Sequence, residues 1–304
     1  MFSAFGLLAS SRPIGFLAFI MLSYVHDFHA GSFADVHKHA VLSIVHAYLN
    51  RKPKPMALVD LYAGSGRYQL NTYAAQKTGE SHRGIERVWP PESWPSELAD
   101  YARCVRAENA DQLKAYPGSP ALLKSLARPI DRLIFNELHP KAQEKLVALY
   151  DRDRQVKLYS RDAHEALVAL VPPTEKRGLI LLDPSYEQKE EYNQLMEGVL
   201  KAFKRWRTGI FIVWYPLLPS NAHRAMVDGI VRGVDCETFV SEIRVPTDGT
   251  GMHGSGMLVL NPTWNLASTM KTLTPWFAQL GGEAGQAVMN NRLNAAPATK
   301  GKRF

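Results

Sequence analysis

The stretch "MALVDLYAGSGRY", residues 56–68, carries the clearest sign of this chain's architecture. Its first half is an apolar run that ends in an acid, which predicts a short strand buried on both faces. Its second half is a turn containing Gly64 and Gly66, and glycine tolerates positive φ and lets a ligand approach the backbone closely. Such a strand and turn are typical of nucleotide-binding folds, although a plain tight turn fits this stretch equally well.

Similar apolar runs recur along the chain and predict six further strands. These runs cover residues 132–138, 156–160, 178–184, 209–216, 237–245 and 256–264. The first five of the seven runs do not alternate, as in parallel strands covered on both faces. Helical patterns lie between them, at 141–150 and 192–206, and another helix is predicted from Ser32 to the prolines of residues 50–55. The alternation predicts an α/β, Rossmann-like, mostly parallel seven-stranded sheet with helices on both faces.

One spacing departs from a minimal fold of this kind. More than 60 residues separate Gly66 from the next predicted strand, whereas a crossover needs only about a dozen or more. Residues 69–118 are therefore predicted to form a helical insertion after the first core strand, inside one domain of residues 21–280.

Both ends of the chain are predicted to lie outside this domain. Residues 1–20 are apolar, but a Ser-Ser-Arg-Pro sequence interrupts them, so we expect a dispensable or disordered extension before a functional start at Met21. A signal peptide is the alternative. Residues 281–304 are rich in Gly, Ala and Asn and predict a disordered tail with a basic tip.

Composition allows a full core and favours a polyanionic partner. The chain has 304 residues, 46% of them hydrophobic, with a net charge of +7 and a pI of about 9.3. A basic balance attracts nucleic acid as a field effect, although many basic proteins never bind it. Cys104 and Cys236 lie far apart in no metal or redox spacing, which favours the cytoplasm. We expect no membrane span and a monomer.

Four of the ten histidines lie in "VHDFHAGSFADVHKH", residues 25–39, and raise the question of a metal site. His37 and His39 are two apart, so they do not share a helix face, and we expect no metal. Neutral imidazoles can instead hydrogen-bond a base, a ribose or a carboxylate. We assign His26 and His39 to the active site, whereas His29 and His37 fit helix-start or packing roles as well.

Acidic residues follow three of the predicted strands. Because the carboxyl ends of parallel strands form the ligand crevice of an α/β sheet, Glu137 is placed to accept both hydroxyls of a ribose. Asp162 is placed to meet an adenine or another ligand edge. Each has a plain alternative: Glu137 can be an ordinary N-cap or surface acid, and Asp162 can cap the following helix.

The segment "LLDPSY", residues 181–186, is the most informative of these strand ends. The carboxylate of Asp183 and the carbonyl of Pro184 can accept the two N–H bonds of an exocyclic amine and aim its nitrogen. Tyr186 can stack on the base, which contributes about 1–3 kcal/mol. A sulfonium methyl donor then requires little beyond positioning. Alone, the segment also fits an ordinary β-turn.

Together these residues resemble the bacterial RlmJ-type 23S rRNA adenine-N6 methyltransferases, a family of class I SAM-dependent methyltransferases. The resemblance covers the chain from Met21 to about Trp276. It rests on "MLSY-H-FHAG--ADV-KH" from 21, "AG-GRYQL" (63–70), "TGE" (78–80), "YPGSP" (116–120), "ELHP" (137–140), "RGLILLDPSYE" (177–187), "WYP" (214–216) and "GM--SGM-V-NP-W" (251–264). It implies N6 methylation of an adenine in 23S rRNA, with S-adenosyl-L-methionine as methyl donor and a protein-free or early assembly form of the RNA as partner.

The resemblance also implies a role for each matching residue. Asp183 is expected to be the catalytic acceptor, and Tyr24 and His26 to reach the target adenine beside Pro184 and Tyr186. The donor-binding set is Lys38, His39, Tyr62, Gly64, Ser119, Glu137, Asp162, Ala163 and Asp183. The chain departs from the family pattern at three positions. Tyr62 stands where His is frequent, Ala163 where Gly is common, and Ser185 replaces a second proline.

Other functions remain compatible with the same motifs. A DNA adenine-N6 methyltransferase would use the same turn, and a methyltransferase-like module could bind rRNA without turnover. Basic residues recur at 50–54, 201–207 and 299–304. Lys201, Lys204 and Arg205 share a helix face, which fits either phosphate contact or an ordinary solvated surface.

Overall fold

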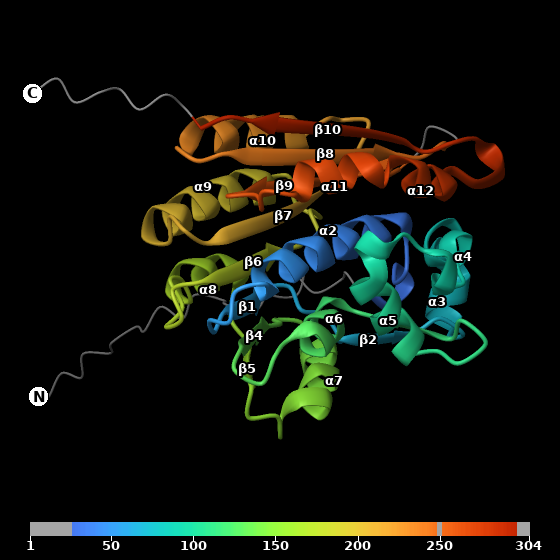
Figure 1. The fold of residues 1–304 in the computed structure, drawn as a ribbon, viewed down its shortest axis with the longest axis horizontal. Coiled ribbons are helices and arrows are strands. Elements are labelled where there is room, and N and C mark those ends of the chain that lie inside the picture. The colour runs from blue at the N-terminus through green and yellow to red at the C-terminus, as the bar shows by residue number, and fades with distance from the viewer. Residues whose placement is uncertain (1–25, 248–250, 297–304) are drawn as a thin grey trace, which may run out of the picture.

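A computed structural model describes residues 26–247 and 251–296. The predicted extension at residues 1–20, Tyr24 and the tip of the tail lie outside the described residues. The main sheet has eight strands in the order β10-β8-β9-β7-β6-β1-β4-β5, from top to bottom in Figure 1. The strands are β1 Ala57–Asp60, β4 Arg132–Asn136, β5 Val156–Tyr159, β6 Gly178–Leu182, β7 Ile210–Leu217, β8 Thr238–Arg244, β9 Gly254–Leu260 and β10 Val288–Asn294.

Strand pairing confirms the predicted α/β, Rossmann-like class. The strands β5, β4, β1, β6 and β7 pair in parallel, and β9 pairs antiparallel with both β7 and β8, so β8 points the same way as β7. Each of the seven predicted strand regions overlaps one strand of this sheet. The number of strands was wrong, because β10 adds an eighth, antiparallel to β8.

The strand β10 corrects the prediction of disorder from residue 281 onward. Its residues pair with β8 along its whole length, from Val288 opposite Arg244 to Asn294 opposite Thr238. Its side chains are mostly exposed, so the strand shows no hydrophobic pattern. The Gly- and Asn-rich composition of this region favoured a prediction of disorder instead. The pairing satisfies backbone groups that β8 would otherwise present at an open edge.

Helices cover both faces of the sheet, as predicted. The helices are α2 Phe33–Asn50, α3 Tyr73–Thr78, α4 Ile85–Val88, α5 Ala99–Ala107, α6 Ser119–Leu126, α7 Pro140–Tyr150, α8 Ala163–Ala169, α9 Glu190–Arg205, α10 His223–Gly233, α11 Leu266–Thr272 and α12 Thr274–Ala278, with short 3₁₀ turns η1 His26–Phe28, η2 Glu80–Arg83, η3 Pro91–Ser93, η4 Ser96–Leu98 and η5 Gln279–Ala284. The core on one face takes side chains from α2, α6, α7, α11 and α12, and the core on the other from α8, α9 and α10. Successive β1 residues alternate between them: Leu58 joins the first core and Val59 the second.

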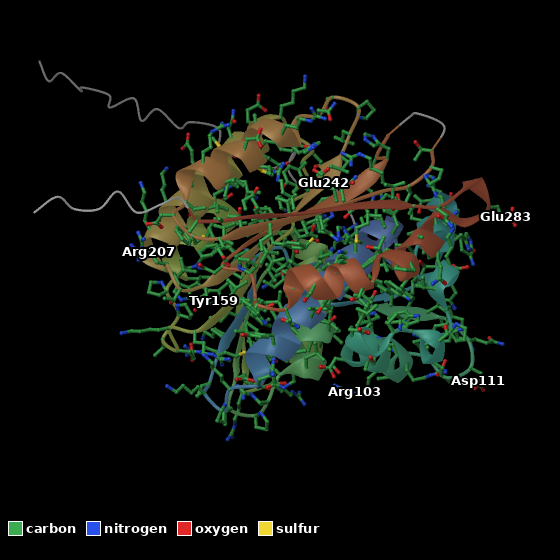
Figure 2. All side chains as sticks on the ribbon, turned by 45° about the horizontal axis from the view of Figure 1, so that its top comes forward. Arg103, Asp111, Tyr159, Arg207, Glu242 and Glu283 are labelled. Carbon is green, nitrogen blue, oxygen red and sulfur yellow. The ribbon has the colours of Figure 1, made fainter. Side chains whose placement is uncertain are left out.

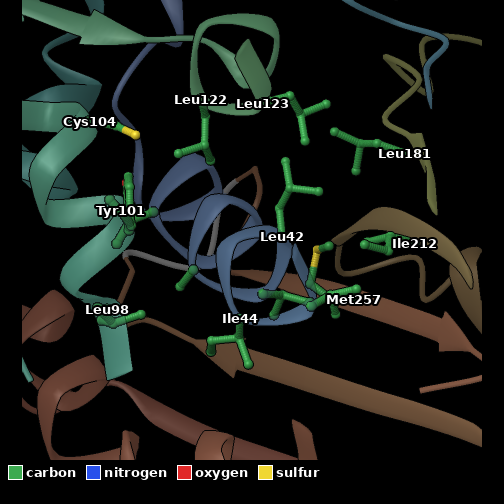
Figure 3. Packing of buried hydrophobic residues seen from close by; sticks show 14 of the residues in the cluster. Leu42, Ile44, Leu98, Tyr101, Cys104, Leu122, Leu123, Leu181, Ile212 and Met257 are labelled. Atoms are coloured by element: carbon green, nitrogen blue, oxygen red, sulfur yellow. The ribbon is translucent and has the colours of Figure 1, made fainter. Parts of the chain in front are cut away.

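The helix α2 lies at the centre of the first core. Ser32 caps it, accepting a hydrogen bond from the backbone N–H of Asp35 at 3.3 Å. Its residues are buried from Phe33 through His46 because the sheet covers one side and the inserted segment the other. Figure 3 shows Leu42 among Leu181, Ile212 and Met257 of the sheet, with Leu98 and Tyr101 of the insertion nearby.

Residues 69–118 hold α3, α4, α5 and three 3₁₀ turns, at the right of Figure 1. Two short antiparallel strands, β2 Arg67–Gln69 and β3 Ala115–Pro117, join the two ends of this segment. Charged side chains such as Arg103, Asp111 and Glu283 lie at the rim of the molecule in Figure 2. Within the described ranges, no helix combines the length and the apolar character that crossing a bilayer requires.

Candidate active site

A cavity of about 460 Å³ opens at the carboxyl ends of the parallel strands, with α2 forming its opposite wall. Its volume lies in the range of small-molecule sites, and it lies where ligands bind in open α/β sheets. Every predicted site residue in the described part of the chain lines it: His26, Lys38, His39, Tyr62, Gly64, Ser119, Glu137, Asp162, Ala163, Asp183, Pro184 and Tyr186. Residues far apart in the sequence thus converge on one cavity, and their individual roles stay predictions.

The glycine turn after β1 is held tightly against its surroundings. Gly64 has a φ of +61°, and its N–H donates to Glu137 Oε2 at 2.7 Å. A Cβ at this position would lie 2.2 Å from the hydroxyl of Tyr68, which itself accepts the N–H of Ser65 at 3.0 Å. The turn therefore needs glycine, and it presents its backbone to the cavity.

Glu137 and Asp162 both organise backbone at the strand ends. Glu137 also accepts the N–H of His139 at 2.7 Å, and burial raises its pKa although these N–H groups oppose the shift. Asp162 Oδ1 accepts the N–H groups of His164 and Glu165, at 2.9 and 3.1 Å, so the predicted cap of α8 is real. Since both carboxylates line the cavity, the capping role and a ligand contact are compatible.

A buried ion cluster joins α2 to the end of β6. Lys38 Nζ lies 2.8 Å from Asp35 Oδ1 and also pairs with Asp183. Asp35 Oδ2 lies 2.9 Å from the backbone nitrogen of Gly31 and 3.0 Å from His26 Nε2. Burial opposes both charges, yet the neighbouring carboxylates raise the pKa of Lys38, and Lys38 and His26 hold the pKa of Asp35 well below its usual value. Lys38 and Asp35 are therefore charged at neutral pH, and Lys38 holds the Asp183 side chain beside its ammonium group.

The two ring nitrogens of His39 have different surroundings among the described residues. Its Nδ1 lies 2.8 Å from the hydroxyl of Tyr116, whose ring stacks on it at 5.4 Å, and Tyr116 in turn bonds Tyr101 at 2.6 Å. Within the described residues, the buried Nε2 has no hydrogen-bond partner. Burial lowers the pKa of His39 to about 3, so the ring is neutral. A neutral imidazole with one nitrogen unused fits a polar ligand group in the cavity.

Aromatic residues form the wall beside Asp183. Tyr186 has a φ of +54°, and its hydroxyl donates to the carbonyl of Trp214 at 2.6 Å. Its ring lies 4.4 Å from that of Tyr192 and 5.9 Å from that of Trp214. Trp214 is held in turn, since its indole N–H donates to Ser255 Oγ at 3.0 Å. Tyr186 is therefore part of a fixed aromatic wall on which a base could be placed.

The histidines of residues 25–39 have separate partners. His29 lies 2.7 Å from Glu80 Oε1, a hydrogen bond that raises its pKa despite partial burial. His37 is buried between Ser241 and Ser255, each at 3.0 Å, which agrees with a packing role. In the part of the chain that the structure describes, no three His, Cys, Asp or Glu side chains are grouped as metal ligands.

Sequence reasoning missed several residues of this site. Asp35 stands three residues before Lys38, a helical pair spacing that could have indicated the ion pair. Tyr116, Glu80 and Trp214 lie inside "YPGSP", "TGE" and "WYP", but none of these three residues was given a role. The acid that ends the first strand, Asp60, was noted but was given no role. Asp60 is fully buried, and burial raises its pKa to about 7 against hydrogen bonds from Ser119 and the Tyr62 N–H.

The strand order and the position of the cavity define a class of protein, the Rossmann-like methyltransferases. Within this class, a family model described as "Ribosomal RNA large subunit methyltransferase D, RlmJ" matches residues 53–292. The chain belongs to this family, which confirms the resemblance seen in its motifs.

Two curated relatives and one solved structure are similar to this chain over most of its length. "Ribosomal RNA large subunit methyltransferase J" of Escherichia coli (strain K12) is 39% identical over 259 residues, covering 84% of this chain and 92% of that protein. The Haemophilus influenzae protein of the same name is 35% identical, covering 85% and 94%. The crystal structure of LPL1258 from Legionella pneumophila has a TM-score of 0.80 at 31% identity and covers 89% of this chain and 99% of that one.

Proposed function

We propose that this protein transfers a methyl group from S-adenosyl-L-methionine to the exocyclic N6 of an adenine in 23S rRNA. Family membership supports methylation of large-subunit ribosomal RNA. One observation supports an amine as the methyl acceptor. The Asp183-Pro184-Ser185-Tyr186 turn lies in the cavity wall, and Lys38 fixes Asp183 there. The turn offers two acceptors and an aromatic ring side by side, which matches an amino group on a flat base.

The cavity residues fit a sulfonium nucleoside. The Gly64 turn lets a ligand approach the backbone, the Glu137 carboxylate suits ribose hydroxyls, and His39 Nε2 is a buried polar atom without a protein partner among the described residues. Ser119, Asp162 and Ala163 line the same wall. When bound, the donor supplies an electrophilic methyl group, and the protein's contribution is to hold the nucleophile in line with it.

Asp183 and Pro184 would act on the amine itself. In free adenine the amine lone pair is delocalised into the ring, so the nitrogen is a poor nucleophile. Hydrogen bonds from the amine to the Asp183 carboxylate and the Pro184 carbonyl would turn the lone pair out of conjugation. A bound donor would supply the methyl group, its S–CH₃ bond breaking as the N–CH₃ bond forms. Asp183 would accept the proton that the methylated amine releases. Lys38 positions that carboxylate through the ion pair between the two side chains.

The test is methyl transfer from labelled donor to protein-free 23S rRNA and to duplex DNA, side by side. We expect N6-methyladenine in the RNA, and a loss of about 10²–10⁴-fold in kcat for Asp183→Asn, which keeps the shape and removes the charge. Glu190→Gln, an exposed carboxylate on the next helix, is the matched control and should retain activity. Label in DNA alone would make the protein a DNA methyltransferase. Binding of both donor and RNA without transfer would make it an rRNA-binding module.

A further inference from the structure

A basic residue precedes every one of the five neighbouring parallel strands. Lys54 precedes β1, Arg128 precedes β4, Arg154 precedes β5, Arg177 precedes β6, and Lys204 and Arg207 precede β7. Because parallel strands begin at a common edge, these residues lie at the amino edge of the sheet, opposite the cavity at the carboxyl edge. Arg207 marks this side at the left of Figure 2.

Hydrogen bonds join the loops of this amino edge into one surface. Arg128 donates to the carbonyls of Lys52 and Lys54, at 2.8 and 2.7 Å, and Arg177 donates to the carbonyl of Lys54 at 2.9 Å. The indole N–H of Trp206, next to Arg207, donates to the carbonyl of Lys176 at 3.2 Å. The two arginines thus fix the loops, and the lysine side chains extend from them into solvent.

The charge of this surface is only partly neutralised. Asp131 pairs with Arg128, Asp153 with Lys124, Glu175 with Arg132 and Asp235 with Arg207. Among the described residues, no carboxylate forms an ion pair with Lys54 or Lys204, and both are exposed. Five strands at about 4.8 Å spacing give a basic row roughly 19 Å long, which suits a row of phosphates.

We infer that the amino edge is a second RNA-contact surface, which holds the phosphate backbone of an rRNA segment distant from the methylated adenine. This inference rests on the proposed function and extends it. Lysine contacts to phosphate position an RNA without reading its sequence. The amino edge would therefore set affinity for a long substrate, while the cavity alone would set the rate of methyl transfer.

The test compares Lys54→Gln/Lys204→Gln with wild type on two RNAs, a long 23S rRNA fragment and a short hairpin that carries the target adenine. Each lost phosphate contact lowers the slope of log Kd against log salt concentration by about one. For the long fragment, the loss of two lysines should therefore lower this slope by about two. It should not change for the hairpin, and kcat should not change for either. Lys77→Gln/Lys271→Gln, two exposed lysines on α3 and α11, is the matched control and should leave both slopes unchanged.

An unchanged slope for the long fragment would overturn the inference, and so would an equal fall for the hairpin, since the contact would then not be remote. Binding is measured without methyl donor, so this result is independent of turnover. Failure of the proposed function would instead appear as no methyl transfer by the wild type to either RNA.

Discussion

At the residue scale, the site depends on buried polar groups whose partners come from distant parts of the chain. Lys38 reaches Asp183 across 145 positions, and His39 reaches Tyr116 across 77. A buried charge is tolerated only with partners, and removing one partner leaves the other uncompensated. The same residues that prepare the cavity therefore also contribute to the stability of the fold.

Lys38→Met should destabilise the protein strongly and abolish methyl transfer. It leaves Asp35 and Asp183 without their shared ammonium group, in a site where the Lys38 side chain is 5% exposed. A loss of about 3–5 kcal/mol in unfolding free energy is expected. Lys145→Met, which breaks the half-exposed pair with Asp27, should cost no more than about 1 kcal/mol. Urea unfolding of both variants measures this; equal losses would contradict the cluster's importance.

Asp60 should make stability depend on pH. In the unfolded chain an aspartate ionises near pH 4, whereas burial raises the pKa of Asp60 to about 7. Between these values the folded state binds the extra proton, so this group's contribution to unfolding free energy falls as pH rises and is constant above about 7. Asp60→Asn should therefore gain stability relative to wild type from about pH 5 to pH 8. Urea unfolding at both pH values is the measurement, and a pH-independent difference would refute it.

At the element scale, the loops after β1 and β4 and the start of α2 control where the site residues lie. The cap at Ser32 starts α2 at the right residue, and α2 then carries Lys38 and His39 to the cavity. Asn136, at the end of β4, donates to the carbonyls of Leu61 and Arg161, at 3.1 and 3.0 Å, and so ties three strand ends together.

Gly64→Ala should disrupt the turn and weaken donor binding. The added Cβ would lie 2.2 Å from the Tyr68 hydroxyl. The alanine would also have to keep the positive φ of this position, which alone costs about 1–2 kcal/mol. Adding Tyr68→Phe removes the clashing oxygen and should restore part of the loss, because the next ring atom is 3.5 Å away. Calorimetric titration with methyl donor measures the effect. If the double variant binds no better than Gly64→Ala, the clash is not the cause.

At the scale of the whole molecule, the sheet separates two chemical edges. The carboxyl ends collect the glycine turn and the acids of the cavity, and the amino ends collect the basic row. The last strand, β10, closes the sheet beside β8 and also packs against α11 and α12. The fold thus depends on a segment whose own side chains are largely exposed.

Truncation after Gln286 should lower Tm and promote association, because it removes β10 and leaves the backbone of β8 as an open edge. Truncation after residue 296, which keeps β10, is the control and should match the full chain. Thermal unfolding and size-exclusion chromatography give the two readouts. A shortened protein with the same association state and Tm as the full chain would show that β10 is dispensable.

The sequence alone determined the strands, the glycine turn and the Asp-Pro-Ser-Tyr turn, because apolar runs and turn chemistry are local properties. It also identified the family, since those short motifs occur in a fixed order. It failed at β10, whose pairing with β8 leaves no hydrophobic pattern in the strand itself.

Only the tertiary structure decided which polar groups meet. Asp35, Lys38 and Asp183 form one ion cluster, and His39 bonds Tyr116 through one nitrogen and lines the cavity, because the sheet brings α2 against the end of β6. The location of Lys54 and Lys204 on the edge opposite the cavity follows from strand direction and order. Such contacts depend on how the chain closes in space, and no local window of sequence contains that information.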